Sequence, residues 1–229
     1  MKAILVGVMA LLVAPVAAAQ VGHEPARSPY VDVEHGQELT PLFGYVRARH
    51  DPAGVAPRSA AMAGVRYEIS LTGPLAFSAD LTRSFSERNL INPLRPRAER
   101  ALGAQSSPVY AADVALAVNL TGRKSWHSLV PQVRAGLGAL SSRAAEDSSG
   151  FSFGTPFAIS LGGGLKFVPA GGRVQLRVDL TDRIFKLRYP DSYYQSASNI
   201  PAVLPTTTTN SFYTHHLAMT VGLSYRFGR

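Results

Sequence analysis

Hydrophobic and polar residues alternate most clearly near the end of the chain, in the segment HLAMTVGLSYRF at 216–227. Every second residue from Leu217 to Phe227 is hydrophobic, and the residues between them are small or polar. Successive side chains of a β-strand point to opposite faces. The segment therefore predicts a strand with one hydrophobic face and one face of small or polar side chains.

Alternation of the same kind marks seven earlier segments, so the pattern predicts eight strands. They are expected at 39–49, 61–71, 75–85, 109–120, 129–140, 155–168, 173–188 and 216–227. The links after the second, fourth and sixth strands are short, whereas those after the odd-numbered strands are longer. Short turns at one end and long loops at the other are typical of outer-membrane barrels. We therefore predict an all-β fold, an eight-stranded antiparallel up-and-down transmembrane β-barrel at 39–229.

The composition of the polar faces favours a membrane barrel over a soluble one. These faces carry mainly Gly, Ala, Ser and Thr, whereas faces in contact with water would carry long residues such as Lys, Glu and Gln. Small residues suit a narrow barrel interior, and a soluble barrel turns its apolar residues inward. Aromatic residues form two groups near the strand ends, as expected at the two membrane interfaces. They are Phe77, Trp126, Phe167, Tyr225 and Phe227 at the short turns, and Phe85, Tyr110, Phe157 and Tyr213 at the long loops.

Charged residues on the polar faces nearly balance in sign. They are Arg66, Glu68, Asp80, Asp113, Arg134, Lys166, Arg177, Asp179 and Arg226. An unpaired charge inside a barrel is costly, so we interpret this set as a structural ion-pair network that fills the lumen. Eight strands leave room only for side chains, which makes a selective pore the less favoured alternative.

The first residues of the chain predict a secretory signal peptide at 1–19. Lys2 supplies the positive charge, an apolar run follows at 3–13, and three alanines at 17–19 form a small-residue cleavage site. The apolar run is shorter than the roughly 18 residues of a spanning helix, which argues against a membrane anchor. We therefore expect export, cleavage after Ala19, an irregular periplasmic tail at 20–38, and location in the bacterial outer membrane.

The net charge points to anionic lipid as the partner. It is +8, or +7 without Lys2. The basic residues are scattered, and an exported chain rarely meets nucleic acid, so no nucleic acid partner is expected. The long loop at 86–108 carries four candidate lipopolysaccharide contacts, since arginine can bind phosphate through two hydrogen bonds. These are Arg88, Arg95, Arg97 and Arg100. The alternative is a solvated mobile loop with no ligand.

No catalytic site, cofactor or metal site is predicted. The sequence has no cysteine and no His-x-Ser-Asn motif of the kind expected in a lipid A deacylase. The segment GFSFG at 150–154 has the spacing G-x-S-x-G, but it lies in a Ser-rich loop predicted at 141–154 and not in a turn between a strand and a helix. His215 and His216 are adjacent, so in a strand they face opposite ways and cannot bind one metal ion from one face. We therefore expect a protein that is not an enzyme.

The segments ELTPLFGYVR, VRYEISLTGPLAFSADLTRSF and VGLSYRF resemble the small eight-stranded outer-membrane β-barrels of Gram-negative bacteria, such as the transmembrane barrel of outer membrane protein A. The resemblance implies that Tyr225 and Phe227 form the signal for the barrel-assembly machinery, although Gly228 and Arg229 follow them. We expect a monomeric integral barrel with a structural or loop-mediated role at the cell envelope. A small pore or solute transporter is the alternative, and a lipid A-modifying enzyme is less favoured.

Overall fold

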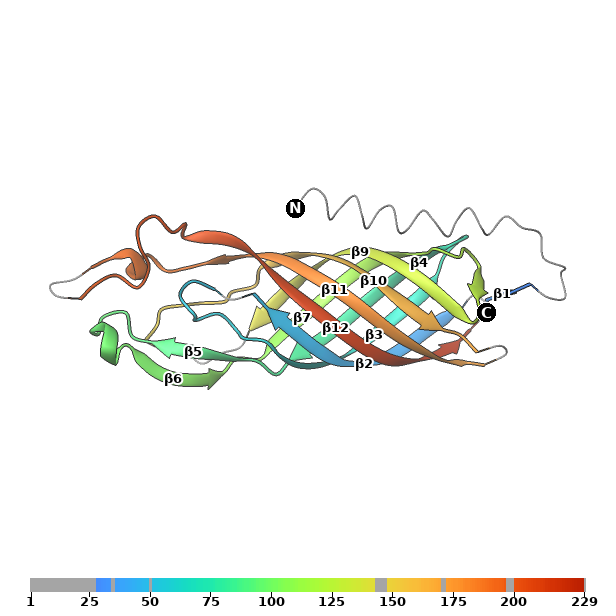
Figure 1. Ribbon diagram of the computed structural model, residues 1–229, viewed down its shortest axis with the longest axis horizontal. Helices are drawn as coiled ribbons and strands as arrows, with labels where there is room; N and C mark the ends of the chain where they lie inside the picture. The colour runs from blue at the N-terminus through green and yellow to red at the C-terminus, as the bar shows by residue number, and fades with distance from the viewer. Residues whose placement is uncertain are drawn as a thin grey trace.

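The computed structural model describes residues 28–33, 36–49, 51–142, 148–169, 172–196 and 200–228, so the predicted signal peptide at 1–19 lies outside the described residues. Within the described part, eight long strands close into an antiparallel barrel (Figure 1). They are β2 (Gln37–Ala48), β3 (Ala60–Ser70), β4 (Leu75–Ser84), β7 (Val109–Asn119), β9 (Leu129–Ser142), β10 (Phe157–Phe167), β11 (Val174–Arg188) and β12 (Ser211–Phe227). Each strand pairs with the next one along the chain, and β12 pairs with β2 to complete the ring.

The predicted eight-stranded antiparallel up-and-down barrel is confirmed. Within the closed ring each long strand has a paired neighbour on both sides, and the backbone groups there bond to one another. Three strands begin earlier than predicted, β3 by one residue at Ala60, β2 by two at Gln37 and β12 by five at Ser211. The extension of β12 follows from its pairing with β11, because Ser211 still lies opposite Arg188. Strands β11 and β12 therefore project beyond the loop end of the other strands (Figure 1).

The links divide between the two ends of the barrel as the sequence predicts. The short links, as far as they are described at 71–74, 120–128, 168–169 and 172–173, lie at one end, near the C-terminus. The long links, as far as they are described at 49, 51–59, 85–108, 148–156, 189–196 and 200–210, lie at the opposite end (Figure 1). In the tightest turn, Gly73 adopts φ +60°, a conformation that glycine takes without steric cost.

Two segments that were predicted to be irregular contain short strands. In the predicted tail, β1 (Tyr30–Asp32) pairs with β8 (Lys124–Trp126), a strand inside the longest of the short links. In the predicted long loop, β5 (Glu87–Ile91) and β6 (Ala101–Ser106) form a hairpin beyond the barrel, with the 3-10 helix η3 (Arg97–Glu99) at its tip. A second 3-10 helix, η4 (Asp191–Tyr194), lies in the last long link. The prolines of the 86–108 segment lie outside both hairpin strands, at its tip and end, so they do not prevent backbone pairing.

Large hydrophobic side chains cover the outer wall of the barrel. Phe43 and Tyr45, whose facing the alternation does not decide, point outward and are 66% and 54% exposed. All nine aromatic residues assigned to the two interfacial groups are exposed as well. Among the described residues, the helical segments are too short or too polar to traverse a bilayer. The strands therefore give the barrel an outer wall that is largely apolar.

Toward the loop end of the barrel, the outward side chains change from apolar to charged and the inward side chains from polar to apolar. On β11, Val178 and Leu180 point outward, but farther along Lys186 points outward while Phe185 and Leu187 are buried inside. On β2 the outward residue changes in the same way, from the exposed Tyr45 to Arg47. An outer wall that changes from apolar to charged marks the level at which lipid would give way to water.

Candidate functional site

The lumen is filled by a network of buried ion pairs centred on Arg177. This side chain is 1% exposed and donates hydrogen bonds to Asp179 Oδ2 at 2.9 Å and to Glu68 Oε2 at 3.2 Å. A further guanidinium nitrogen donates to Gln132 Oε1 at 3.2 Å. Arg177 therefore links three carbonyl or carboxylate groups from three different strands, which locks their side chains in one arrangement.

A second cluster surrounds Asp80. Arg66 donates to Asp80 through two nitrogens, at 2.7 and 2.9 Å, and to Asp179 Oδ2 at 2.9 Å. Arg134 donates to Asp80 Oδ2 at 2.8 Å and to the Ser78 hydroxyl at 3.2 Å. Arg66 thus connects the Asp80 cluster to that of Arg177, so the ion pairs form one network across the barrel.

The end of the lumen near the short turns is occupied by Lys166 and two glutamates. The Lys166 ammonium group donates to Glu38 Oε2 at 2.8 Å and to Glu68 Oε1. Arg226 lies at the same end, where its guanidinium donates to the Gly172 carbonyl at 3.2 Å. The structure therefore places all nine sequence-predicted lumen charges inside the barrel. One connected network contains Arg66, Glu68, Asp80, Arg134, Lys166, Arg177 and Asp179.

Two lumen charges were missed by the sequence analysis, Glu38 and Arg183. Glu38 was assigned to the tail, but it is the second residue of β2 and binds Lys166. Arg183 binds Asp113 with its nearest nitrogen at 2.8 Å from the carboxylate, in a pair closer to the loop end. Arg183 continues the same every-second-residue pattern as Arg177 and Asp179, so that pattern was a signal that could have identified it.

Glycines on neighbouring strands make room for two of the lumen carboxylates. A methyl group at Gly138 or at Gly164 would collide with the side chain of Asp113 or of Asp179, respectively. Gly164 is the last residue of a run of three glycines on β10 and lies opposite Asp179 on β11, which gives a specific reason for a glycine there. Strand glycines are typical where another group approaches the backbone closely.

The loop end of the barrel is closed by apolar side chains. Val46, Met62 and Ala218 form a small buried cluster inside the wall. Beyond it lies a larger core, which we call the cap, and each of the four long links contributes to it. Its buried members are Val55, Ala56, Ile91, Val109, Ala111, Leu140, Phe151, Ala158, Phe185, Leu187, Tyr189, Tyr193 and Leu204.

Within the cap, Tyr189 joins the last long link to the first. Its ring stacks on Tyr193, with 5.9 Å between centroids, and its hydroxyl donates to Asp51 Oδ1 at 2.9 Å. Asp51 also accepts hydrogen bonds from the backbone amides of the turn that follows it, including that of Ala56 at 2.7 Å. Burial raises the pKa of Tyr193 to about 12, and burial together with the Asp51 carboxylate raises the pKa of Tyr189 further. Both phenols therefore stay neutral at physiological pH.

The four arginines proposed as lipopolysaccharide contacts separate into two pairs. Arg88 is 3% exposed, lies 5.7 Å from the centre of the Phe151 ring, and contacts Ser149 at 3.5 Å. Arg100 is 9% exposed and donates to carbonyl oxygens in the last long link, including that of Ala202 at 3.4 Å. Arg95 and Arg97 are exposed at the tip of the β5–β6 hairpin. The buried pair holds the hairpin to the rest of the cap, and the exposed pair remains available for a ligand.

The two adjacent histidines lie on opposite faces of β12. His215 is on the outer face, with Nδ1 2.7 Å from Asp182 Oδ2, whereas His216 is buried with its ring edge-on to Phe185 at 4.7 Å. Within the described residues, no group of three or more His, Cys, Asp or Glu side chains is placed to hold a metal ion.

No protein-family model and no curated protein matches this chain. Among solved structures, Neisserial surface protein A is 13% identical over 84% of this chain and 97% of its own, with a TM-score of 0.48. The N-terminal β-barrel domain of OprF from Pseudomonas aeruginosa is 13% identical over 83% of this chain and 98% of its own (TM-score 0.42). The outer membrane protein Ail of Yersinia pestis is 12% identical over 85% of this chain and 100% of its own (TM-score 0.38). The eight-stranded barrel that the sequence resemblance implies is confirmed by the closed strand order of this chain.

Proposed function

We propose that this protein is a non-enzymatic, closed barrel of the bacterial outer membrane that presents a preformed cap at the cell surface. The observation that carries the proposal is the combination of an apolar outer wall with a lumen filled by ion pairs. A soluble barrel has the opposite distribution, with charges outside and apolar residues inside. The exposed aromatic residues near both ends of the wall support placement across a bilayer.

The orientation follows from the lengths of the links. Short turns of outer-membrane barrels lie in the periplasm and long loops lie outside the cell. The even number of strands then puts both barrel termini in the periplasm, where an exported chain would arrive. In this orientation the cap faces the medium, and its four links can present a defined surface to a partner.

The filled interior argues against the alternative of a pore. A continuous path would have to pass the Arg177 and Asp80 clusters and then the apolar cap. Moving an ion past buried apolar side chains is costly because its hydration shell is lost. We therefore expect no steady conductance.

Fractionation and conductance test this proposal together. The protein should be recovered in the outer-membrane fraction of a Gram-negative host and should resist extraction with urea or carbonate. An epitope inserted after Arg97 should be detected on intact cells, whereas one inserted after Gly73 should require permeabilised cells. In planar bilayers the purified protein should give no steady channel openings. Recovery as a detergent-free soluble protein would overturn the membrane assignment, and regular openings would favour the pore.

Recognition by the barrel-assembly machinery is a further part of the proposal. Phe227 is the last residue of β12 and is 38% exposed on the outer wall. Phe227→Ala should lower the assembled fraction, whereas Tyr213→Ala, which removes an exposed aromatic from the other end of the same strand, should have little effect. Deletion of Gly228 and Arg229 should also be milder. Heat-modifiable migration on gels measures the folded fraction, and equal assembly of all the variants would refute this role.

The exposed hairpin tip is the proposed contact with lipopolysaccharide. Arg95→Ser combined with Arg97→Ser should weaken binding to purified lipopolysaccharide at low salt, because two phosphate-binding cations are removed. The difference should shrink as salt rises, since exposed charges are screened over about 8 Å at physiological ionic strength. Arg123→Ser, at an exposed position in a link at the other end of the barrel, is the matched control. Unchanged binding at low salt would make the hairpin a structural part of the cap only.

A further inference from the structure

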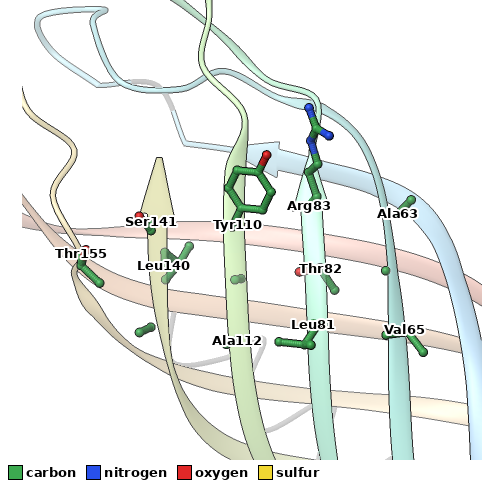
Figure 2. A pocket seen from close by; sticks show the side chains of 13 residues that line it. Ala63, Val65, Leu81, Thr82, Arg83, Tyr110, Ala112, Leu140, Ser141 and Thr155 are labelled. Atoms are coloured by element: carbon green, nitrogen blue, oxygen red, sulfur yellow. The ribbon is translucent and has the colours of Figure 1, made fainter. Parts of the chain in front are cut away.

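A groove crosses the outer wall over β3, β4, β7 and β9, just below the loop end (Figure 2). Its volume is about 490 Å³, and its lining is almost entirely apolar. The floor is made by Ala112 and Ala139, which lie opposite each other in adjacent strands, and Leu81 borders it on the β4 side. Two adjacent alanines on a wall of larger side chains leave a depression there.

The end of the groove nearest the loops carries a cation and hydroxyl groups. Arg83 and Tyr110 lie opposite each other in β4 and β7, and Ser141 follows on β9. In Figure 2 the Arg83 side chain extends from the apolar part of the groove toward the loops. Its guanidinium carbon lies 5.2 Å from the centre of the Phe85 ring and 5.4 Å from that of Tyr110.

Arg83 is held by aromatic rings rather than by an acid. Among the described residues, no carboxylate lies within salt-bridge distance of it, in contrast to the arginines of the lumen. An exposed cation placed over two aromatic rings keeps its charge available for an anion while its position is restricted. The groove thus combines space for a hydrocarbon chain with a fixed positive charge at one end.

We propose that this groove binds one acyl chain of lipopolysaccharide, with a lipid A phosphate bound by Arg83. The inference rests on the proposed function, because the orientation given there puts the Arg83 end of the groove in the outer leaflet, which consists of this lipid. The charge fits an anionic headgroup, and the apolar floor below it fits the attached chain. The site lies on the wall of the barrel and does not include the exposed arginines of the hairpin tip.

Filling the groove is the sharpest test. Ala112→Leu and Ala139→Leu place larger apolar side chains at positions that already face outward, so the barrel should fold normally. In detergent micelles titrated with purified lipid A, each should weaken binding by about tenfold, because several methylene groups of the acyl chain lose their contact with the wall. Ala135→Leu makes the same change on β9 outside the groove and should bind like the parent.

The charge is tested separately with Arg83→Gln. This variant should weaken lipid A binding several-fold at low salt and less at high salt, because it removes a screened charge contact. Arg47→Gln, which removes an outward-facing arginine on β2, is the control and should leave binding unchanged. The same titrations with phosphatidylglycerol, which has a single phosphate and two chains, compare lipid A with an ordinary anionic phospholipid.

The outcomes separate the inference from the proposed function. Normal lipid A binding by both alanine variants would overturn the groove as a chain-binding site, even if the protein fractionates with outer membranes. Equal loss of phosphatidylglycerol and lipid A binding in these variants would overturn the assignment to lipopolysaccharide in favour of a general phospholipid site. Loss of lipid A binding in the variants, with a parent protein that is absent from the outer membrane, would support the groove and refute the proposed location.

Discussion

The lumen and the cap are both interiors of this molecule, but they are filled by opposite kinds of side chain. In the lumen, fully buried Arg177 contacts Asp179 on its own strand and Glu68 on β3, so its charge is neutralised by neighbouring carboxylates. In the cap, aromatic and aliphatic side chains from the four long links pack together, and Tyr189 lies at the centre of three ring contacts. The two regions meet near Phe185 and Arg183, which are two residues apart on β11.

The surroundings of each region account for this difference. Where the outer wall is apolar, the strands must turn their other residues inward, and charges are tolerated there because they find partners within the narrow barrel. Where the wall becomes polar, the hydrophobic residues of the same strands can turn inward and are buried under the loops. The lumen therefore depends on complementary charge and the cap on ordinary hydrophobic packing, and each should respond to a different kind of substitution.

The largest expected effect comes from breaking the lumen network at Arg177. Arg177→Met removes the charge while keeping an extended side chain, and it leaves Glu68 and Asp179 with fewer partners. We expect a loss of about 3–5 kcal/mol in the free energy of unfolding, because buried charges lose their compensation. Urea titration in lipid vesicles, followed by the fluorescence of Trp126, the only tryptophan, measures it.

A double-mutant cycle distinguishes this effect from a loss of packing. If the pair is coupled, Asp179→Asn added to Arg177→Met should cost less than the sum of the two single changes. Val178→Ala, the next residue along β11 but facing outward, is the control and should be much milder. Additive losses would mean that Arg177 acts through its volume and not through its charge.

A smaller and local effect is expected from Tyr189→Phe in the cap. The substitution removes the hydroxyl that donates to Asp51 and should destabilise the cap by about 1–3 kcal/mol, the usual cost when a buried partner is lost. The chain has no cysteine, so the alkylation rate of an introduced Val55→Cys reports cap opening. Tyr194→Phe, which loses an exposed hydrogen bond to Thr209 in the same link, is the control. The urea midpoint of the barrel should stay unchanged, and a parallel fall would show that cap and lumen unfold together.

The same division explains how far the sequence could predict the structure. A strand that separates lipid from a crowded lumen must alternate with a period of two. The sequence therefore assigned the hydrophobic residues from Leu217 to Phe227 to the outer face and Arg177 and Asp179 to the lumen, as the structure has them. Beyond the lipid this constraint ends, and hydrophobic residues such as Leu187 point inward. Alternation alone does not reveal where that change occurs. The burial of Arg88 could not be predicted either, because it depends on contacts with a link that is distant in the sequence.

The smallest expected effect is the opening of the cap at high pH. An exposed tyrosine titrates near pH 10, whereas burial raises the pKa of Tyr193 to about 12 in the closed cap. Between pH 10 and 12 the Tyr193 phenol loses its proton more readily in the open form than in the closed cap. The contribution of Tyr193 to the stability of the closed cap is therefore complete below pH 10 and decreases as the pH rises toward 12. The alkylation rate of Val55→Cys relative to that of Leu94→Cys, an exposed reference position, should therefore increase between pH 10 and 12. Tyr193→Phe should reduce this pH dependence, because phenylalanine has no proton to lose.

Since the buried tyrosines of the described residues lie only in the cap, the circular dichroism of the barrel should change less than the alkylation ratio over the same range. A barrel that unfolds before the cap opens would show that the lumen is the weaker interior in alkali.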